Sequence, residues 1–165
     1  MTYVAIVSGL GESASSYANG LTALMHLLRG MAGFAADRFA WSDRGRVINS
    51  LMLYHDADAV LVGHSFGGSV CLDVAEAIAP RSCRLFLIDP VPTSAGKRWT
   101  PGFAFTPPPN VTTTTCYRRT WFLPYPRAKD VRMTSRSVNV PIAGTDHNSV
   151  VMPACRMIFE ALRLS

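Results

Sequence analysis

The chain has 165 residues, of which 48% are hydrophobic and 16% are charged, and its formal net charge is +5. This length and composition predict one globular domain over residues 1–165 and exclude a disordered chain. The basic residues are scattered and no zinc-finger spacing occurs, so we expect no nucleic-acid binding. We see no signal peptide and no apolar run of transmembrane length, and therefore expect a cytoplasmic protein without stable membrane insertion.

Patterns typical of strands and helices alternate along the chain. Strands are predicted at 3–7, 33–36, 57–62, 84–88, 111–117 and 137–143, and helices over roughly 14–29, 44–55, 66–78 and from Ser149 to the last turn. Proline-rich irregular segments occupy 90–110 and 121–126. This alternation predicts an α/β fold with a mostly parallel sheet of about six strands, flanked by helices on both faces.

The cysteines and one acidic turn are the places where a metal would be sought. Cysteines stand at 71, 83, 116 and 155 without a Cys-x-x-Cys pair, so we interpret them as buried reduced thiols. His55-Asp56-Ala57-Asp58 falls in a helix-to-strand turn, where such groups are usually solvated. We therefore expect no metal site and no organic cofactor.

The sequence Gly63-His64-Ser65-Phe66-Gly67 follows an apolar strand pattern and precedes a helical one. This is the Gly-x-Ser-x-Gly pattern, in which the glycines permit a sharp turn that exposes the serine at the end of the strand. A serine exposed in this way becomes a nucleophile only when a base accepts its proton. Ser65 is thus the predicted nucleophile.

A neutral imidazole can accept that proton near neutral pH. Of the four histidines, His26 lies within a helix, His55 lies at the wrong end of the predicted sheet, and His64 adjoins the serine. His147 follows a predicted strand in a loop with Gly144, so we predict that it is the base.

Three segments together resemble the α/β-hydrolase superfamily of lipases and esterases. They are Gly63–Gly68 at the serine turn, Leu87-Ile88-Asp89-Pro90 at the next strand end, and Gly144-Thr145-Asp146-His147-Asn148 before the last helix. The order serine, acid, histidine agrees with that superfamily. The resemblance implies a reduced α/β-hydrolase fold, because the chain starts at what would be the third strand. The shortened sheet edge could pair with a second subunit to give a homo-oligomer.

The resemblance also implies roles for further residues. Asp130 follows the next predicted strand, where this superfamily often keeps its acid, but it lies in a charged stretch that we interpret as solvated. Asp89, at the strand end that follows Ser65, is therefore the preferred acid of a Ser-Asp-His triad, and Asp130 is the alternative that the sequence leaves open. The oxyanion hole maps to the backbone N–H groups of Leu10 and Phe66. Removing such a donor typically slows catalysis by about two to three orders of magnitude.

Aromatic side chains in the two irregular segments are candidates for an apolar substrate pocket, although they could equally pack as a satellite cluster. The candidates are Trp99, Phe103, Trp121 and Phe122, with Phe105 and Tyr125 nearby. The sequence therefore predicts a serine hydrolase that cleaves small carboxylic esters through an acyl-enzyme, with thioesters and amides left open. A non-catalytic protein of this fold that binds a lipophilic molecule or a partner chain is the alternative.

Overall fold

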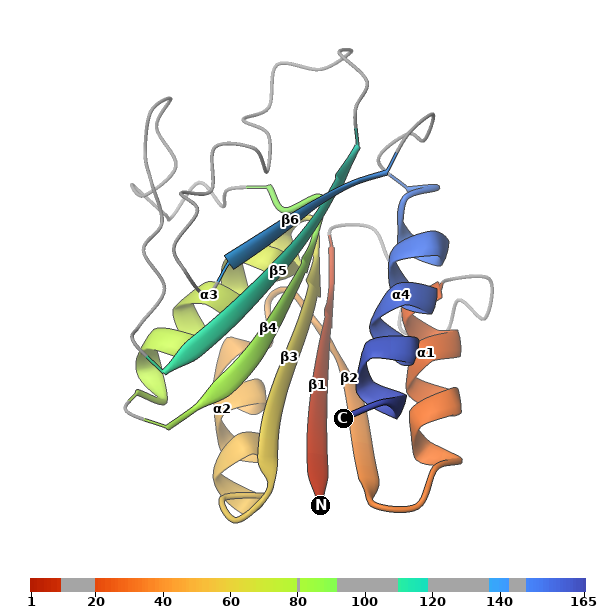
Figure 1. Cartoon of the computed structure of the whole chain (residues 1–165). Helices are drawn as coiled ribbons and strands as arrows, with labels where there is room; N and C mark the ends of the chain where they lie inside the picture. Colours follow the sequence, from red (N-terminus) through yellow and green to blue (C-terminus); the bar gives the residue numbers. More distant parts are fainter. Residues whose placement is uncertain (10–19, 80, 92–109, 119–136, 143–147) are drawn as a thin grey trace.

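The computed structural model describes residues 1–9, 20–79, 81–91, 110–118, 137–142 and 148–165. The elements in chain order are β1 (Thr2–Ser8), α1 (Gly20–Arg29), β2 (Phe34–Ala40), α2 (Arg44–Leu53), β3 (Asp58–His64), α3 (Phe66–Ala77), β4 (Cys83–Ile88), β5 (Val111–Arg118), β6 (Ser137–Ile142) and α4 (Val151–Arg163). The strands form one six-stranded sheet in the order β2-β1-β3-β4-β5-β6, and every pairing is parallel (Figure 1). The predicted fold class is confirmed.

Helices cover both faces of this sheet, with α1 and α4 on one face and α2 and α3 on the other (Figure 1). Successive side chains of a strand point to opposite faces, so each face has its own core. Val4, Ile6 and Phe86 pack toward α1 and α4. Leu61 and Leu85 pack toward α2 and α3. No helix within the described ranges is long and apolar enough to cross a bilayer.

The predicted ends of several elements differ from the observed ones by a few residues. The weak strand at 33–36 continues to Ala40, because β2 pairs with β1 along its whole length. Asp43 is the N-cap residue of α2, but its side chain makes no capping bond and accepts a hydrogen bond from Arg46 at 3.2 Å instead. The last helix is predicted to begin with Ser149 as its cap, which is wrong, because α4 begins at Val151 and Val150 is its N-cap residue.

The turn from α2 to β3 is held by one arginine. Arg81 donates to the carbonyl oxygens of Leu51 at 2.7 Å, Tyr54 at 2.8 Å and Ala57 at 2.5 Å. The last carbonyl groups of a helix have no intrahelical donors, so a guanidinium there satisfies them. Arg81 therefore fixes the turn that leads from α2 into β3.

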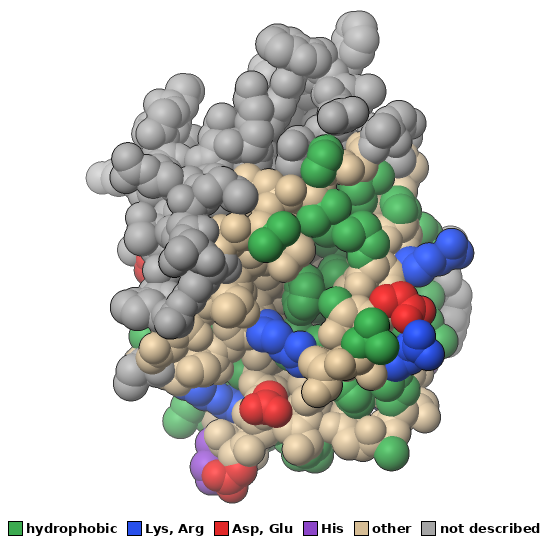
Figure 2. Space-filling model, in the orientation of Figure 1, with side chains coloured by type: hydrophobic (Ala, Val, Ile, Leu, Met, Phe, Trp, Pro, Cys, Tyr) green, Lys and Arg blue, Asp and Glu red, His purple; other side chains and the backbone are tan. Residues whose placement is uncertain are grey.

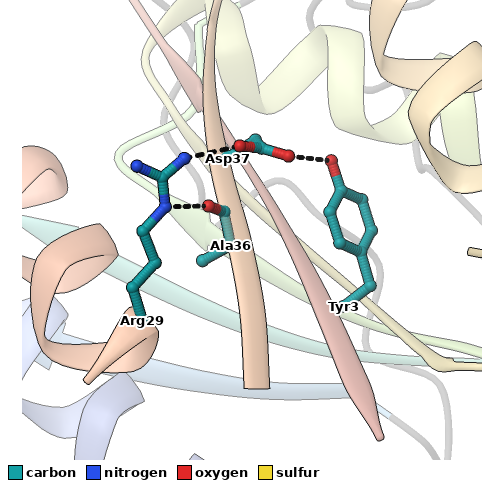
Figure 3. Close-up of polar contacts among 4 residues, drawn as sticks. All are labelled: Tyr3, Arg29, Ala36 and Asp37. Atoms are coloured by element: carbon teal, nitrogen blue, oxygen red, sulfur yellow. Dashed lines mark hydrogen bonds and ion pairs between the residues drawn. The ribbon is translucent and has the colours of Figure 1, made fainter. Parts of the chain in front are cut away.

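β2 forms one edge of the sheet, and α1 reaches around it (Figure 3). Arg29 Nε donates to the Ala36 carbonyl oxygen at 2.6 Å, and its Nη2 donates to Asp37 at 2.6 Å. Asp37 also accepts the Tyr3 hydroxyl at 3.1 Å, and the Tyr3 ring stacks on Tyr54 at 4.2 Å. The edge strand thus has a carbonyl already occupied by its own chain, which makes pairing with another strand less favourable there. Homo-oligomerisation through this edge stays a prediction.

Candidate active site

Ser65 lies between β3 and α3 at the carboxyl edge of the sheet. Its backbone has φ 55° and ψ −125°, a conformation that residues with a Cβ rarely adopt. The turn is held by hydrogen bonds from the Ser65 N–H to the Ile88 oxygen at 3.1 Å, and to the Ser65 oxygen from Gly68 and Val91 at 3.0 Å each. The surrounding strands therefore impose this conformation on Ser65.

The glycines around Ser65 are required by close backbone approach. A Cβ on Gly63 would lie 2.5 Å from the Gly67 oxygen, and a Cβ on Gly67 would collide with the Val7 oxygen at the end of β1. A Cβ on Gly68 would lie 2.7 Å from the Pro90 Cβ. Because only glycine fits, α3 can begin directly against the ends of β1 and β4.

The segment that leaves β1 touches the predicted nucleophile. A Cβ placed on Gly9 would lie 2.7 Å from the Ser65 Cβ and 3.2 Å from its Oγ. Phe66 is the first residue of α3, and the N–H groups in the first turn of a helix have no acceptor within the helix. The structure thus brings together Ser65, Phe66 and the backbone that immediately precedes Leu10, which itself lies outside the described residues.

Asp89 follows β4, the strand next to β3, and is buried at the same edge as Ser65. Its φ is 37°, and its N–H donates to the Cys116 oxygen at 2.7 Å. Asp and Asn tolerate this left-handed region better than most residues. Asp89 is therefore held on the adjacent strand end, as the sequence predicted, while the rival Asp130 lies outside the described residues.

Most of the other predicted site residues also lie outside the described ranges. These are His147, Trp99, Phe103, Trp121 and Phe122. The nearest described residues in the sequence are Ile142 at the end of β6 and Asn148, which lies in the turn before α4. The roles of these residues in the base and the substrate pocket stay predictions.

The remaining histidines lie as the sequence indicated. His26 and His55 are exposed, and His55 Nε2 lies 3.2 Å from Asp56 Oδ2 in a solvated turn. His64 is buried at 1% exposure beside Ser65. Within the described ranges, no three His, Cys, Asp or Glu side chains gather closely enough to hold a metal ion. The four cysteines are buried thiols, as predicted.

One residue near the site was not singled out from the sequence. Trp41 follows the end of β2 and is half-buried, and its ring lies 5.6 Å from the Phe66 ring at an angle of 42°. The predicted strand at 33–36 ends five residues before Trp41, so the sequence pattern did not mark this residue, and only the observed β2 and the sheet order bring it near Ser65. An apolar surface therefore adjoins the serine turn.

A cavity of about 620 Å³ opens at the opposite end of the sheet, on the face viewed in Figure 2. Thr2, Asp58, Arg84 and Asn110 are among its lining residues, all at or beside the amino ends of strands. Ser65 and Asp89 do not line it. This cavity is separate from the carboxyl edge where the candidate site lies.

Comparison with known proteins identifies the fold. The sequence pattern of the Alpha/beta hydrolase family matches residues 4–154. A solved protein of the alpha/beta superfamily from Xanthomonas campestris is 20% identical, with a TM-score of 0.65 and full coverage of both chains.

Two further solved structures resemble the chain at lower identity. One, from Xanthomonas campestris, is described as a member of the a/b serine hydrolases without a lid; it is 19% identical, with a TM-score of 0.59, and the match covers 98% of this chain and 79% of that one. The other, from Thermus thermophilus, is 14% identical, with a TM-score of 0.62 and coverages of 99% and 88%. A search of the curated proteins finds no match. The six-stranded parallel sheet, its serine turn and the match over residues 4–154 place this chain in the alpha/beta hydrolase family.

Proposed function

We propose that this protein is a serine hydrolase that cleaves small carboxylic esters through an acyl-enzyme. The observation that carries the proposal is the conformation of Ser65, with φ 55° at the end of a buried parallel strand and glycine backbone packed against its side chain. Strained backbone of this kind persists where the surroundings enforce it, and it clusters at functional sites. Family membership supports hydrolytic chemistry at this position.

In the proposed reaction, Ser65 Oγ attacks the ester carbonyl while His147 accepts its proton, and Asp89 orients the imidazole. The distance from β6 supports this role for His147. Three strand spacings separate β3 from β6, which amounts to about 14 Å. Residues 143–147 can span at most about 17 Å beyond Ile142, so the imidazole is within reach of Ser65.

The proposed oxyanion hole uses the N–H groups of Phe66 and Leu10. The start of α3 at Phe66 and the contact of Gly9 with Ser65 support this pair, since both backbones approach the serine from adjacent strand ends. Fixed donors at these positions stabilise the negative charge that develops on the carbonyl oxygen. Water then hydrolyses the acyl-enzyme, and the cycle involves no cofactor.

The preference for esters with apolar groups rests on aromatic residues. The Trp41 and Phe66 rings adjoin the serine turn, and Trp99, Phe103, Trp121 and Phe122 are proposed to complete the pocket. Thioesters and amides undergo the same acyl transfer. A panel of substrates that carry the same acyl group as an ester, a thioester and an amide shows which of the three the enzyme hydrolyses fastest.

The test is labelling of the folded protein with a fluorophosphonate, followed by intact mass and peptide mapping. We expect one adduct, located on Ser65, and no adduct on Ser65→Ala. Ser82→Ala is the matched control, because Ser82 is exposed and precedes β4 at the amino edge. Hydrolysis of p-nitrophenyl butyrate by the wild type and by Ser82→Ala, but not by Ser65→Ala, completes the expected result. A folded wild-type protein that stays unlabelled would favour the non-catalytic binding protein instead.

A further inference from the structure

A groove runs between α1 and α4, the two helices that lie side by side on one face of the sheet (Figure 1). The helices start together, because a Cβ on Gly20 would lie 2.8 Å from Met152 Sδ. Leu27 and Phe159, each two turns further along its helix, line the same groove. Because two helical turns rise about 10 Å, the groove is elongated. Its volume is about 320 Å³, and Ser65 does not line it.

The walls of this groove are mostly apolar. Leu24 and Cys155 belong to the core beneath it. Above them, the side chains of Leu27 and Met152 are 54% and 56% exposed. Exposed apolar side chains are ordinary when scattered, but around a concave surface they indicate a binding site. Six apolar side chains contribute to the walls: Ala23, Leu24, Leu27, Met152, Cys155 and Phe159.

The charged residues on the rim leave one positive charge uncompensated. Arg156 and Glu160 stand one turn apart on α4, and both line the groove. Arg163 donates to Glu160 Oε2 at 2.7 Å from Nη2 and at 3.1 Å from Nε, so this carboxylate is already compensated. Among the described residues, no hydrogen bond or ion pair holds the Arg156 guanidinium. The rim therefore favours a ligand with a negative charge.

Both walls are held in place without a ligand. Leu28 anchors α1 in the core, and Ile158 anchors α4 in the same core. Thr22 of α1 also accepts a hydrogen bond from Arg38 of β2, which ties this helix to the sheet edge. A preformed apolar groove of this kind binds a ligand without first having to order its own walls.

We infer that the groove is a second binding site, which takes a carboxylate with a medium-length acyl chain. The chain lies along the groove against Leu27, Met152 and Phe159, and the carboxylate pairs with Arg156. Burial of the methylene groups supplies most of the affinity. The planar guanidinium can bind both carboxylate oxygens through parallel hydrogen bonds. Because Ser65 is not part of the groove, the inference does not depend on the proposed function.

The same charges disfavour a second copy of the chain as the occupant. Two copies that met across this groove would bring together two rims that each carry two arginines, Arg156 and Arg163, and one glutamate, Glu160. The whole chain also has a net charge of +5, so two copies repel each other. A narrow groove between two helices fits an extended acyl chain better than the broad surface of another protein.

The test is titration of isotope-labelled protein with sodium octanoate at concentrations where it is monomeric, followed by amide NMR. We expect saturable shifts that gather on Ala23, Leu27 and Phe159. Octanol and octylamine carry the same chain with a neutral and a positive head group. Octanol should bind about threefold more weakly than octanoate, because a partly exposed ion pair contributes modestly, and octylamine should bind more weakly still.

Variants separate the head group from the chain. Arg156→Gln should weaken octanoate binding by about threefold and leave octanol binding unchanged. Arg44→Gln is the matched control, since Arg44 is an exposed arginine at the start of α2, on the other face of the sheet. Leu27→Gln should weaken the binding of both ligands by about fivefold, because it removes an apolar contact. If it does not fold, Met152→Gln removes the facing contact and should act in the same way.

Four outcomes overturn the inference, and each leaves fluorophosphonate labelling of Ser65 unaffected. The amides of α1 and α4 do not shift in a folded wild type. Octanoate shifts only the amides around the serine turn, such as Gly67, which would make it a ligand of the candidate active site. Octanoate and octanol bind equally well. The amides of α1 and α4 shift with protein concentration alone and no longer do so in Leu27→Gln, which would assign the groove to a second copy.

Discussion

Ser65 and Asp89 are, within the described ranges, the two non-glycine residues with positive φ. They end neighbouring strands, and each is fixed by backbone hydrogen bonds to the next strand or loop. Backbone strain of this kind costs about 1–3 kcal/mol per residue. This strain falls on Ser65 and Asp89, the two predicted triad residues that the structure describes. A substitution at either position can therefore change the stability of the fold independently of the activity.

Replacing Ser65 by glycine or by alanine should separate these effects. Both variants lack the hydroxyl and should be inactive. Ser65→Gly should be more stable than Ser65→Ala by about 1 kcal/mol, because glycine adopts φ 55° without strain. Urea unfolding of the two variants measures the difference. At Ser82, which is not among the residues with positive φ, the same pair should show alanine at least as stable as glycine. A less stable Ser65→Gly would show that the turn is unstrained.

Asp89→Asn should lower kcat by about three to four orders of magnitude, since the amide can neither orient the imidazole in the required tautomer nor stabilise its charge. Asparagine tolerates the observed φ of 37°, so the melting temperature should change little. Ester hydrolysis and thermal unfolding of the same samples check both parts. Asp130→Asn is the matched comparison and should retain most activity. The opposite ranking of the two variants would assign the acid to Asp130.

At the scale of elements, β5 has a sequence typical of a strand but places polar threonine side chains in the protein interior. Its threonine-rich sequence predicts a strand because β-branched residues favour a pleated surface. In the described part of the structure, the Oγ1 atoms of Thr113 and Thr115 are buried and lack a hydrogen-bond partner. Both residues pair with β6, opposite Ser137 and Asn139. A buried hydroxyl without a partner destabilises the fold.

Thr113→Val and Thr115→Val should therefore stabilise the protein, each by about 1 kcal/mol, because valine has nearly the same shape without the desolvated hydroxyl. Urea unfolding measures the change. Thr112→Val is the control, since Thr112 is exposed on the same strand and the substitution should change the unfolding free energy by less than about 0.5 kcal/mol. Destabilisation at positions 113 and 115 would instead indicate that these hydroxyls bind internal water in solution.

At the scale of the whole molecule, the two cores contain ionisable groups that are neutral at physiological pH. Burial raises the pKa of Cys83 and of Cys116 to about 11. Burial also raises the pKa of the Cys71 thiol and of the Tyr3 hydroxyl above their ordinary values. These groups ionise more readily in the unfolded chain than in the folded protein, so alkaline solution favours unfolding.

These thiols should therefore leave the stability of the protein independent of pH below about pH 8.5 and should lower it between there and about pH 11. In that window the unfolded state binds fewer protons, so each thiol lowers the unfolding free energy by about 1.4 kcal/mol per pH unit. Urea unfolding from neutral to alkaline pH measures the slope. A Cys83→Ala, Cys116→Ala variant should have a shallower slope, whatever its stability at pH 7. Equal slopes would show that the two thiols do not cause the loss.

Local sequence patterns were sufficient to predict most of the strands and helices and the turn at Ser65. Apolar periodicity predicted the strands and helices, since side chains alternate across a strand and repeat every 3.6 residues around a helix. The glycines around Ser65 predicted the turn, because that turn has no room for a Cβ. Sequence patterns at the ends of helices and strands were less informative about where each element begins. The cap of α4 was misassigned because a capping side chain is only one way to satisfy a helix terminus.

The sequence by itself determined the layered class of fold and the chemistry available at Ser65, because both depend on residues close together in the chain. Only the tertiary structure decided which strand ends become neighbours. The insertion of β1 between β2 and β3 brings Gly9 against Ser65 and Trp41 near Phe66, and the reach of Arg29 around β2 occupies the Ala36 carbonyl at the edge. These contacts arise from strand order and helix packing over long separations in sequence, which local periodicity does not encode.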